Sequence, residues 1–258
     1  RPGLLCWMAV EWLMEQRIET GIDKAGHFGR LTERFRSYGP YRSLLDRLSK
    51  SDPTRLTVTG LNGSSEGMLL ASLSRELKRP LLIVTESSND AQEIYEDLLF
   101  IEGEARVGLY PSRQILPYDF RAPVGEVMGQ RISSLAGLLD NSLPIVICPV
   151  RALIEPTIPR DVLAGTMISI RRGDEVDMDD LVARLVRLGF RRVPLVEEVG
   201  DFARRGGLID LFTPGADAPV RIEFFGDEID TIREFEVGSQ RTPGHLESVQ
   251  VLPKREIP

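Results

Sequence analysis

The sequence has few of the residues that build metal sites or disulfide frameworks. Its 258 residues include only two cysteines, Cys6 and Cys148, and two histidines, His27 and His245. The cysteines are too few and too far apart for a disulfide framework or a zinc site, and the histidines have no partner at ligand spacing. We therefore expect neither a metal site nor a structural disulfide.

Long hydrophobic runs are also missing. The apolar stretch at residues 4–14 is interrupted by Glu11 and followed by Glu15, so it is too short and too charged for a membrane span. It also lacks the small-residue cleavage pattern of a secretory signal. These observations predict a cytoplasmic protein with no membrane partner.

The chain has no excess of positive charge. Lysine and arginine number 32 against 39 aspartate and glutamate residues, which gives a net charge of −7. This balance argues against nucleic-acid binding by the chain as a whole, because phosphate neutralisation needs a basic surface, although a local basic patch is compatible with it. The contents of 42% apolar and 28% charged residues are typical of a globular protein of one large or two modest domains.

From residue 56 the sequence alternates between short apolar runs and helical patterns. Such alternation predicts a parallel sheet with helices on both faces, hence an α/β domain. Ser88 or Asn89 is expected to cap one of its helices. Strands are predicted at residues 56–59, 81–85, 107–110 and 145–148, and helices at 68–78, 88–102, 126–139 and 151–155.

After Pro156 and Pro159 the pattern changes to that of a small α+β domain with an antiparallel sheet. Asp177 is expected to cap its helix. Strands are predicted at residues 167–170, 208–212, 220–225 and 229–235, and a strand at 249–252 is expected to return to the α/β domain. The predicted division is 1–52 for N-terminal helices (3–20 and two within 28–50), 53–160 for the α/β domain, 161–245 for the inserted α+β domain and 246–258 for the return segment.

The strand at residues 220–225 has two distinct faces. Val220, Ile222 and Phe224 fall on one side, which we assign to the core, whereas the other side carries Arg221, Glu223 and Phe225. An aromatic side chain beside a bidentate donor on a stiff strand is typical of a protein-docking surface. The alternative is a half-solvated sheet in which Arg221 merely pairs with a neighbouring glutamate.

The turn at residues 60–67 stands where a phosphate-binding loop would lie, between a predicted strand and a helix. A working loop has the pattern Gly-x-x-x-x-Gly-Lys followed by Ser or Thr. Counting from Gly60, the second glycine is replaced by Ser65, the lysine by Glu66 and the hydroxyl residue by Gly67. A carboxylate would repel polyphosphate. We therefore interpret this loop, which also contains Gly63, as degenerate, and expect no nucleotide cofactor.

Several motifs in order resemble a known family. The runs at residues 200–207, 208–212, 221–229 and 239–242 look like the second domain of bacterial transcription-repair coupling factors (Mfd), a module shared with excinuclease subunit UvrB. The resemblance covers roughly residues 55–258. It implies a module that docks UvrA and a neighbouring nucleotide fold that has lost its phosphate loop.

The resemblance also implies roles for individual residues. Arg205, Arg221 and Phe225 match the partner-binding positions of the family, and Arg204 is a weaker candidate. RNA polymerase and DNA would be contacted through other domains of a longer ATP-dependent DNA translocase that links stalled polymerase to nucleotide excision repair, with no catalysis in this fragment. On this interpretation Arg221→Ala should weaken UvrA binding by about 2 kcal/mol while leaving folding nearly intact.

Three alternatives remain at this point. A nucleotide-binding domain is suggested by fold position alone, and a direct DNA-binding module is disfavoured by the acidic charge balance. An N-terminal fragment of UvrB should have the loop lysine and a long aromatic β-hairpin, but only about a dozen residues follow Tyr110 before the next predicted helix. Tyr118 and Phe120 are therefore expected to be core or loop anchors.

Overall fold

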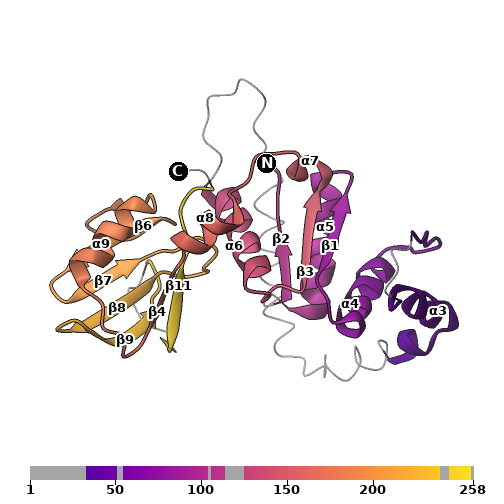
Figure 1. Ribbon diagram of the computed structural model, residues 1–258, viewed down its shortest axis with the longest axis horizontal. Coiled ribbons are helices and arrows are strands. Elements are labelled where there is room, and N and C mark those ends of the chain that lie inside the picture. Colours follow the sequence, from indigo (N-terminus) through magenta and orange to yellow (C-terminus); the bar gives the residue numbers. More distant parts are fainter. Residues whose placement is uncertain (1–32, 51–54, 104–105, 114–124, 239–243, 257–258) are drawn as a thin grey trace.

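The computed structural model describes residues 33–50, 55–103, 106–113, 125–238 and 244–256. They form two units that lie side by side in Figure 1, one built on a parallel sheet and the other on a mainly antiparallel sheet. The helix predicted at residues 3–20 lies outside the described residues, as do Tyr118 and Phe120.

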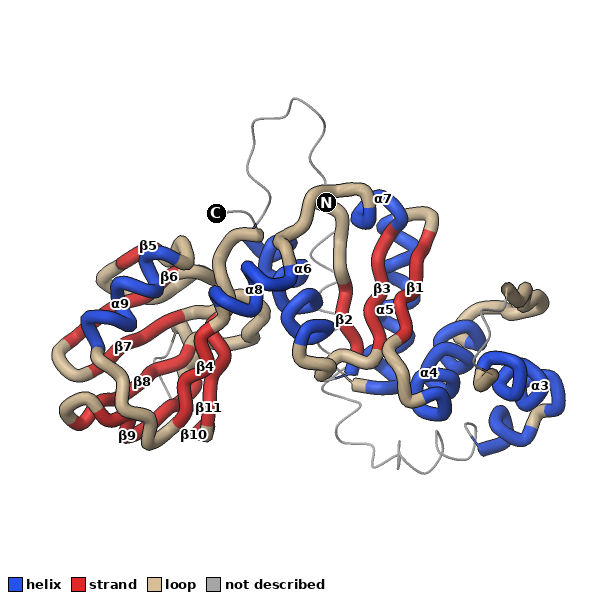
Figure 2. The backbone as a smooth tube through the Cα atoms, in the orientation of Figure 1, coloured by secondary structure: helices blue, strands red, loops and turns tan. Residues whose placement is uncertain are grey.

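A three-stranded parallel sheet forms the centre of the α/β unit. Its strands are ordered β1 (Leu81–Thr85), β3 (Ile145–Pro149) and β2 (Val107–Leu109). These strands confirm three of the predicted runs to within one residue at their ends. Parallel neighbours need a crossover connection, which the intervening helices provide, as the blue and red segments of Figure 2 show.

Helices cover both faces of this sheet, as the alternating pattern predicted. On one face Ala71 and Leu98 join Ile147 in a buried cluster. On the other face Ala152 packs with Val146, and these two clusters form the core of the unit. The helices, in chain order, are α4 (Ser65–Leu77), α5 (Ser88–Glu102), α6 (Gly125–Leu139) and α7 (Val150–Leu153).

Helix α5 is capped one residue earlier than predicted. The cap is Ser87, whose Oγ accepts a hydrogen bond from the backbone N–H of Asp90 at 3.1 Å, while the Asp90 carboxylate accepts one from the Ser87 N–H at 3.2 Å. This reciprocal pair is a capping box and satisfies two backbone donors that the helix itself leaves without partners.

The strand predicted at residues 56–59 does not form. Residues 55–62 have no β pairing, and β1 is an edge of the parallel sheet. Residues 57–60 are exposed, and from this segment it is Leu61 that joins the cluster around Tyr41 of helix α3 (Gly39–Leu48). Here the apolar run at residues 56–59 predicts neither the strand nor full burial.

The second unit is a six-stranded sheet with the order β10-β9-β8-β7-β6-β5, beside a two-stranded pair, β11-β4. The predicted meander is confirmed as β7, β8 and β9, which are antiparallel neighbours. Helix α9 begins after Asp177, whose carboxylate accepts from the Asp180 N–H at 2.8 Å, so the predicted cap is also confirmed. The elements are α8 (Arg160–Thr166), β4 (Ile168–Arg171), α9 (Met178–Arg187), β5 (Arg191–Arg192), β6 (Asp201–Arg205), β7 (Leu208–Leu211), β8 (Val220–Phe225), β9 (Glu228–Glu234), β10 (His245–Leu246) and β11 (Ser248–Val251).

The strand that was predicted to return to the α/β unit stays with the antiparallel unit. This strand, β11, pairs with β4, and its Val251 is buried in the same cluster as Leu181 of α9. Contact with the α/β unit begins at the next residue, Leu252, which packs with Ile132 and Leu163. The strand was correctly located, but its partner was wrong.

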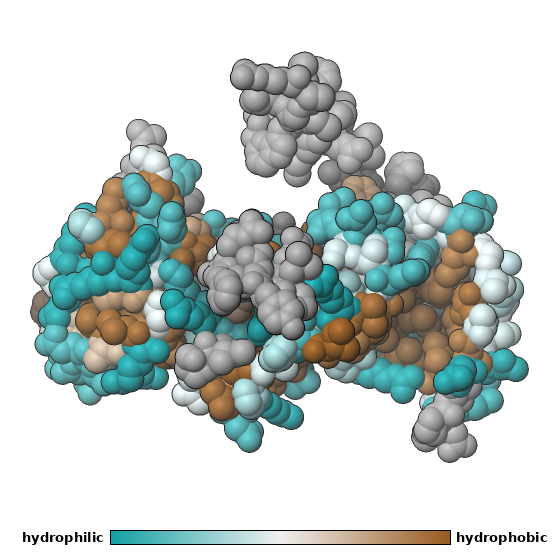
Figure 3. Space-filling model, turned by 90° about the horizontal axis from the view of Figure 1, so that it is seen from above, coloured by the Kyte–Doolittle hydropathy of each residue, from teal (hydrophilic) through white to brown (hydrophobic). Residues whose placement is uncertain are grey.

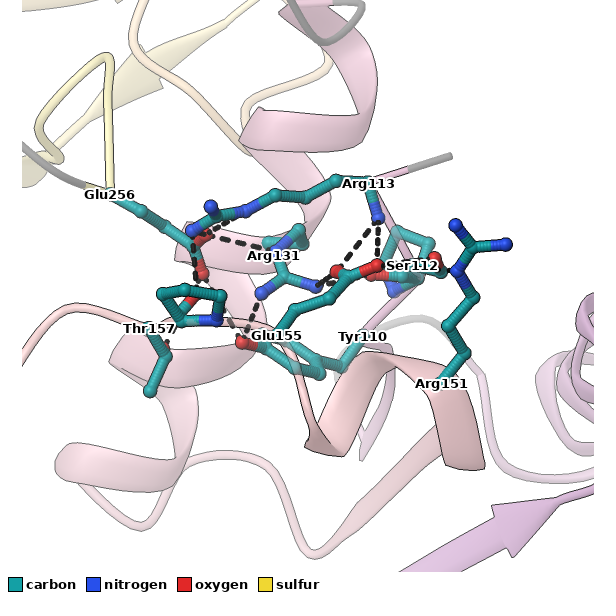
Figure 4. A network of polar contacts seen from close by, with 10 residues as sticks. Tyr110, Ser112, Arg113, Arg131, Arg151, Glu155, Thr157 and Glu256 are labelled. Carbon is teal, nitrogen blue, oxygen red and sulfur yellow. Dashed lines mark hydrogen bonds and ion pairs between the residues drawn. The ribbon is translucent and has the colours of Figure 1, made fainter. Parts of the chain in front are cut away.

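A buried network of charged side chains then fixes this segment to the α/β unit (Figure 4). Arg131 and Glu256 have fully buried side chains, and Arg131 Nε donates to Glu256 Oε2 at 3.0 Å. Arg113 Nη2 donates to the same oxygen at 2.5 Å, and Arg131 Nη1 donates to Glu155 Oε2 at 3.0 Å. Two guanidinium groups thus face two carboxylates, which is the arrangement that makes buried charge tolerable.

Tyr110 belongs to the same network. The guanidinium carbon of Arg131 lies 4.1 Å from the centroid of its ring, and Arg131 Nη2 donates to its hydroxyl oxygen at 2.5 Å. The Tyr110 hydroxyl donates to Glu256 Oε1 at 3.2 Å. Burial raises the pKa of Tyr110 above the ordinary value for a phenol.

The loop that joins β7 to β8 packs directly on helix α6. Gly215 has φ of +78°, and a Cβ atom placed on it would lie 2.6 Å from the side chain of Ser133. A Cβ on Gly129 of the same helix would in turn lie 3.6 Å from the backbone nitrogen of Gly215. The backbones of the two units approach each other this closely because both positions are glycine.

Apolar side chains also reach the surface of the α/β unit, as the brown areas of Figure 3 show. Leu82 and Val84 of β1 are about half exposed, at 57% and 47%, and Ile154 after α7 is 82% exposed. Within the described ranges, no helix combines the length and the apolar character that crossing a membrane requires.

Candidate functional site

The predicted site residues lie on one sheet, so its register decides which of them share a face. Leu208 of β7 lies opposite Arg205 of β6 on one side and opposite Glu223 of β8 on the other. Arg221 and Phe225 stand two residues before and after Glu223 in the same strand, so all of these side chains are on one side. We call this side, which carries Arg205, Arg221 and Phe225, the outer face.

The opposite side of the sheet is the core. Ile222 and Val220 of β8 are buried at 0% and 2% exposure and pack in one cluster with Leu181 and Leu185 of α9. Phe224 is only partly buried and packs at the margin of this cluster. Because α9 covers this side, exposed side-chain surface in the middle of β8, such as that of Arg221, lies on the outer face.

Arg204 does not share the outer face. It neighbours Arg205 in β6, so its side chain points to the side covered by α9. There it forms an ion pair with Asp179 in the first turn of that helix. The structure thus separates Arg204 from the other three predicted residues and gives it a contact within the chain.

Arg221 is held by Asp210, which lies directly opposite it on β7. Nε and Nη2 of Arg221 donate to the two carboxylate oxygens of Asp210 at 2.7 and 2.8 Å, a bidentate pair. The hydrogen bonding with Asp210 raises the pKa of Arg221, although partial burial opposes the shift. The guanidinium carbon also lies 4.9 Å from the centroid of the Phe235 ring, so the group is fixed by two contacts.

This geometry lies between the two interpretations offered by the sequence. Arg221 is paired within the sheet, but with an aspartate across the strand and not with a glutamate. Its side chain keeps 19% of its surface exposed, whereas the side chain of Asp210 keeps only 4%. The substitution Arg221→Ala would leave a buried carboxylate without its bidentate partner, so the structure favours a loss of stability over the expectation that folding stays nearly intact.

A second arginine lies opposite Arg221 on the outer face. Arg233 of β9 pairs with Arg221 in the register, and like charges opposite one another in a sheet are unfavourable. Each arginine has its own carboxylate, because Arg233 forms an ion pair with Glu223 while Arg221 binds Asp210. Thr231 also donates to Glu223 at 3.0 Å, which holds this carboxylate in place.

Phe225 stands at the end of β8, beside the turn at Gly226, which has φ of +65°. It is 81% exposed, by far the most exposed phenylalanine side chain of the sheet. The register shifts between Glu223 and Phe224, because β9 has one extra residue, Asp230, between the partners of these two residues. Phe225 therefore contributes little to the stability of the fold, in agreement with its predicted place on the side away from the core.

Arg205 is exposed at the end of β6, before the turn at Gly206 and Gly207. Its Nη2 donates to the backbone oxygen of Pro194 at 3.1 Å. This bond restrains the side chain beside the outer face without burying it. Arg205, Arg221 and Phe225 thus offer two cations and one apolar ring on the same side of the sheet.

The sequence did not reveal Asp210 and Phe235 as parts of the site. Asp210 has a recognisable signal, since it is a charged residue between Ile209 and Leu211 in an apolar run and therefore lies on the face opposite to them. Its pairing with Arg221 depends on the register of β7 with β8, and the eight residues of the connecting loop, 212–219, leave that register open.

The loop at residues 60–67 places carboxylates where a phosphate would need cations. Glu66 is exposed in the first turn of α4. The next residue, Gly67, lies against Asp97 of α5: a Cβ atom placed on Gly67 would be 3.2 Å from the Cβ atom of Asp97. Ser64 Oγ donates to Asp97 Oδ1 at 3.3 Å. Ser65 Oγ bonds only within its own loop in the contacts described, donating to the Asn62 oxygen at 2.9 Å. These surroundings would repel an anion.

The described residues contain no group of three or more His, Cys, Asp and Glu side chains placed to hold a metal ion. The carboxylates near the outer face, Asp210 and Glu223, are each engaged by an arginine. What the outer face offers is therefore recognition by hydrogen bonding, charge and apolar contact.

Comparisons with known proteins match most of this chain. Residues 168–257, which include the outer face, match the family model of the UvrB interaction domain. The chain is 36% identical to the transcription-repair-coupling factor of Myxococcus xanthus over 84% of its own length, and 30% identical to that of Bacillus subtilis over 84%. It is 31% identical to that of Escherichia coli over 77% of its length. The chain spans about a fifth of the length of these relatives.

Proposed function

Since this chain belongs to the transcription-repair-coupling factor family and contains a UvrB interaction domain, we propose that it recruits UvrA through the outer face. In this proposal it is the N-terminal region of a longer protein that links stalled RNA polymerase to nucleotide excision repair. RNA polymerase and DNA are contacted by other parts of that protein, which also carry its ATP-dependent translocase activity.

One observation carries the proposal. Phe225 is 81% exposed and shares a face with Arg205 and with Arg221, whose guanidinium is fixed in position. Arginine and aromatic residues are over-represented among the residues that dominate binding energies, and preorganised side chains lose less entropy on association. A large exposed aromatic beside fixed cations is suited to an apolar pocket rimmed by carboxylates on the partner.

In this proposal the α/β unit holds the partner-binding sheet in place and neither binds a nucleotide nor catalyses a reaction. Its degenerate loop carries Glu66 and lies against Asp97 of α5, where a nucleotide phosphate would require cations, which supports a function without a cofactor. The buried network around Arg131 and Glu256 joins this unit to the segment that follows β11. This network thereby attaches the unit that contains the six-stranded sheet to the α/β unit.

The test is titration calorimetry of purified UvrA with the intact chain and with the double variant Arg205→Ala/Phe225→Ala. The double variant should lose at least 30-fold in affinity, about 2 kcal/mol, because both side chains are exposed and their loss leaves the sheet intact. Arg187→Ala/Val186→Ala on α9 is the matched control, since both side chains are exposed on the opposite side of the sheet. Equal affinities for the two double variants would remove the outer face from the proposal.

A further inference from the structure

Asp210 is an unusual residue to find at its position. It is 3% exposed and carries a carboxylate on the middle strand of the sheet. A buried carboxylate is costly unless it is paired and hydrogen-bonded. Both of its oxygens accept from Arg221, at 2.7 and 2.8 Å, so the pairing offsets that cost but also commits the carboxylate to this one side chain.

The neighbouring charges make Arg221 depend on this carboxylate. Arg233 lies opposite Arg221 on β9, and Glu223, two residues further along β8 on the same side, forms an ion pair with Arg233. If Asp210 were neutral, two guanidinium groups would share Glu223, and Arg221 would be drawn toward it or away from Arg233. The position of Arg221 therefore depends on the charge of Asp210 as well as on its shape.

Phe235 supplies the second restraint. Its ring is fully buried, and the Arg221 guanidinium carbon lies 4.9 Å from its centroid. The contact with the ring and the two hydrogen bonds to Asp210 together restrain the position and the rotation of the guanidinium. What remains exposed of Arg221, 19% of its side chain, is presented in one orientation.

We propose that Asp210 is a positioning residue for partner recognition, which acts by fixing the Arg221 guanidinium toward the outer face and does not itself touch the partner. This inference rests on the proposed function of the outer face. It differs from a purely structural role, in which the Asp210–Arg221 pair would stabilise the sheet without affecting binding by the folded protein.

A double-mutant cycle for UvrA binding separates these two roles. Asp210→Asn keeps the shape and one acceptor oxygen but removes the charge, and it should weaken binding by the folded chain about 10-fold. In the Arg221→Ala background the same substitution should change the affinity less than about twofold, since the side chain to be positioned is absent. Equal fold-changes in both backgrounds, or no change in the intact background, would overturn the proposal.

Asp201 provides the matched control. It is 1% exposed in β6 of the same unit and accepts from Nε and Nη2 of Arg191 at 3.0 and 3.3 Å, so it is a second buried aspartate paired with an arginine. Asp201→Asn should lower the melting temperature and leave UvrA affinity unchanged. A loss of affinity as large as that of Asp210→Asn would mean that sheet stability governs binding, which would also overturn the proposal.

Failure of this inference differs from failure of the proposed function. If the intact chain binds UvrA and Phe225→Ala weakens it while Asp210→Asn does not, the outer face stands and Asp210 has no positioning role. If the intact chain does not bind UvrA at all, the proposed function fails first. Thermal melts of each variant establish the folded fraction, and Asp210→Glu, which restores the charge, should recover part of the lost affinity.

Discussion

Arg131 and Glu256 are joined by a 3.0 Å hydrogen bond, although 125 residues separate them in the sequence and neither side chain is accessible to solvent. The contact connects helix α6 to the segment that follows β11. It is the point at which the last part of the described chain is held on the α/β unit.

Glu256→Gln should lower the free energy of unfolding by about 3 kcal/mol, because it leaves the buried Arg131 without one of its two carboxylates. Urea denaturation monitored by circular dichroism measures this. Glu198→Gln is the control, since Glu198 and its partner Arg191 have side chains 73% and 60% exposed, and it should cost no more than about 0.5 kcal/mol. Similar losses of unfolding free energy for both variants would contradict the expectation that the buried ion pair contributes more to stability than the exposed one.

Arg221→Ala should lower the free energy of unfolding by about 2 kcal/mol, because Asp210 then becomes a buried carboxylate without its bidentate partner. The double variant Arg221→Ala/Asp210→Ala should be more stable than Arg221→Ala alone, since it removes the unpaired charge as well. Chemical denaturation of the three proteins tests this, and an additive further loss in the double variant would contradict it.

Phe225→Ala should weaken UvrA binding and leave the stability of the chain almost unchanged. The side chain is 81% exposed, so the stability of the chain should change by less than about 0.5 kcal/mol, whereas UvrA binding should weaken at least 10-fold. A thermal melt and a binding titration on the same preparation make the comparison. Phe202→Ala, which removes a fully buried ring from the same unit, should show a large loss of stability.

The loop at residues 60–67 should bind no ATP, and Glu66→Lys alone should not create binding, because Asp97 remains against Gly67. Fluorescence anisotropy with a labelled ATP analogue measures both proteins. Saturable binding to the unmodified chain at micromolar nucleotide would show that the degenerate loop is functional.

Alkaline pH should destabilise the chain through Tyr110. Its folded-state pKa is raised by burial above the value of about 10 for the unfolded chain, so the folded state holds the proton more tightly. The contribution to stability is complete below about pH 10 and is lost as the pH rises through the folded-state pKa. Denaturation between pH 8 and about 11 should show a decline that is smaller in Tyr110→Phe, where no hydroxyl titrates.

Much of the fold could be predicted because local signals agreed with the tertiary structure. Asp177 and Gly189 bracket the helix α9, and the alternation in residues 220–225 assigns the two faces of β8 correctly. The incorrect predictions concern which strands pair with one another. Residues 56–59 have the composition of a strand but have no β pairing, and β11 pairs with β4 in the antiparallel unit.

The candidate site could be predicted in part for the same reason. The family resemblance proposes Arg205, Arg221 and Phe225 as partner-binding residues, which stays a prediction, and the alternation along β8 correctly places Arg221 and Phe225 on one face. Asp210 required the register of β7 with β8, which no local pattern determines. Glu256 is in a charged run, and charged residues are almost never fully buried unless paired, so its burial depends on Arg113 and Arg131 far away in the sequence.

The six-stranded sheet ends on both sides in strands of only two residues, β5 and β10. Beyond β10, the outer border of β9 is covered by the turn after β4, where the N–H of Gly173 donates to Ile229 and the N–H of Ile229 donates to Asp174. Long rows of unpaired backbone groups are what an incoming peptide needs to add itself to a sheet. The two end strands of the described six-stranded sheet are each too short to offer such a row, so we expect a partner to recognise this sheet through its side chains more than by extending its ladder of main-chain hydrogen bonds.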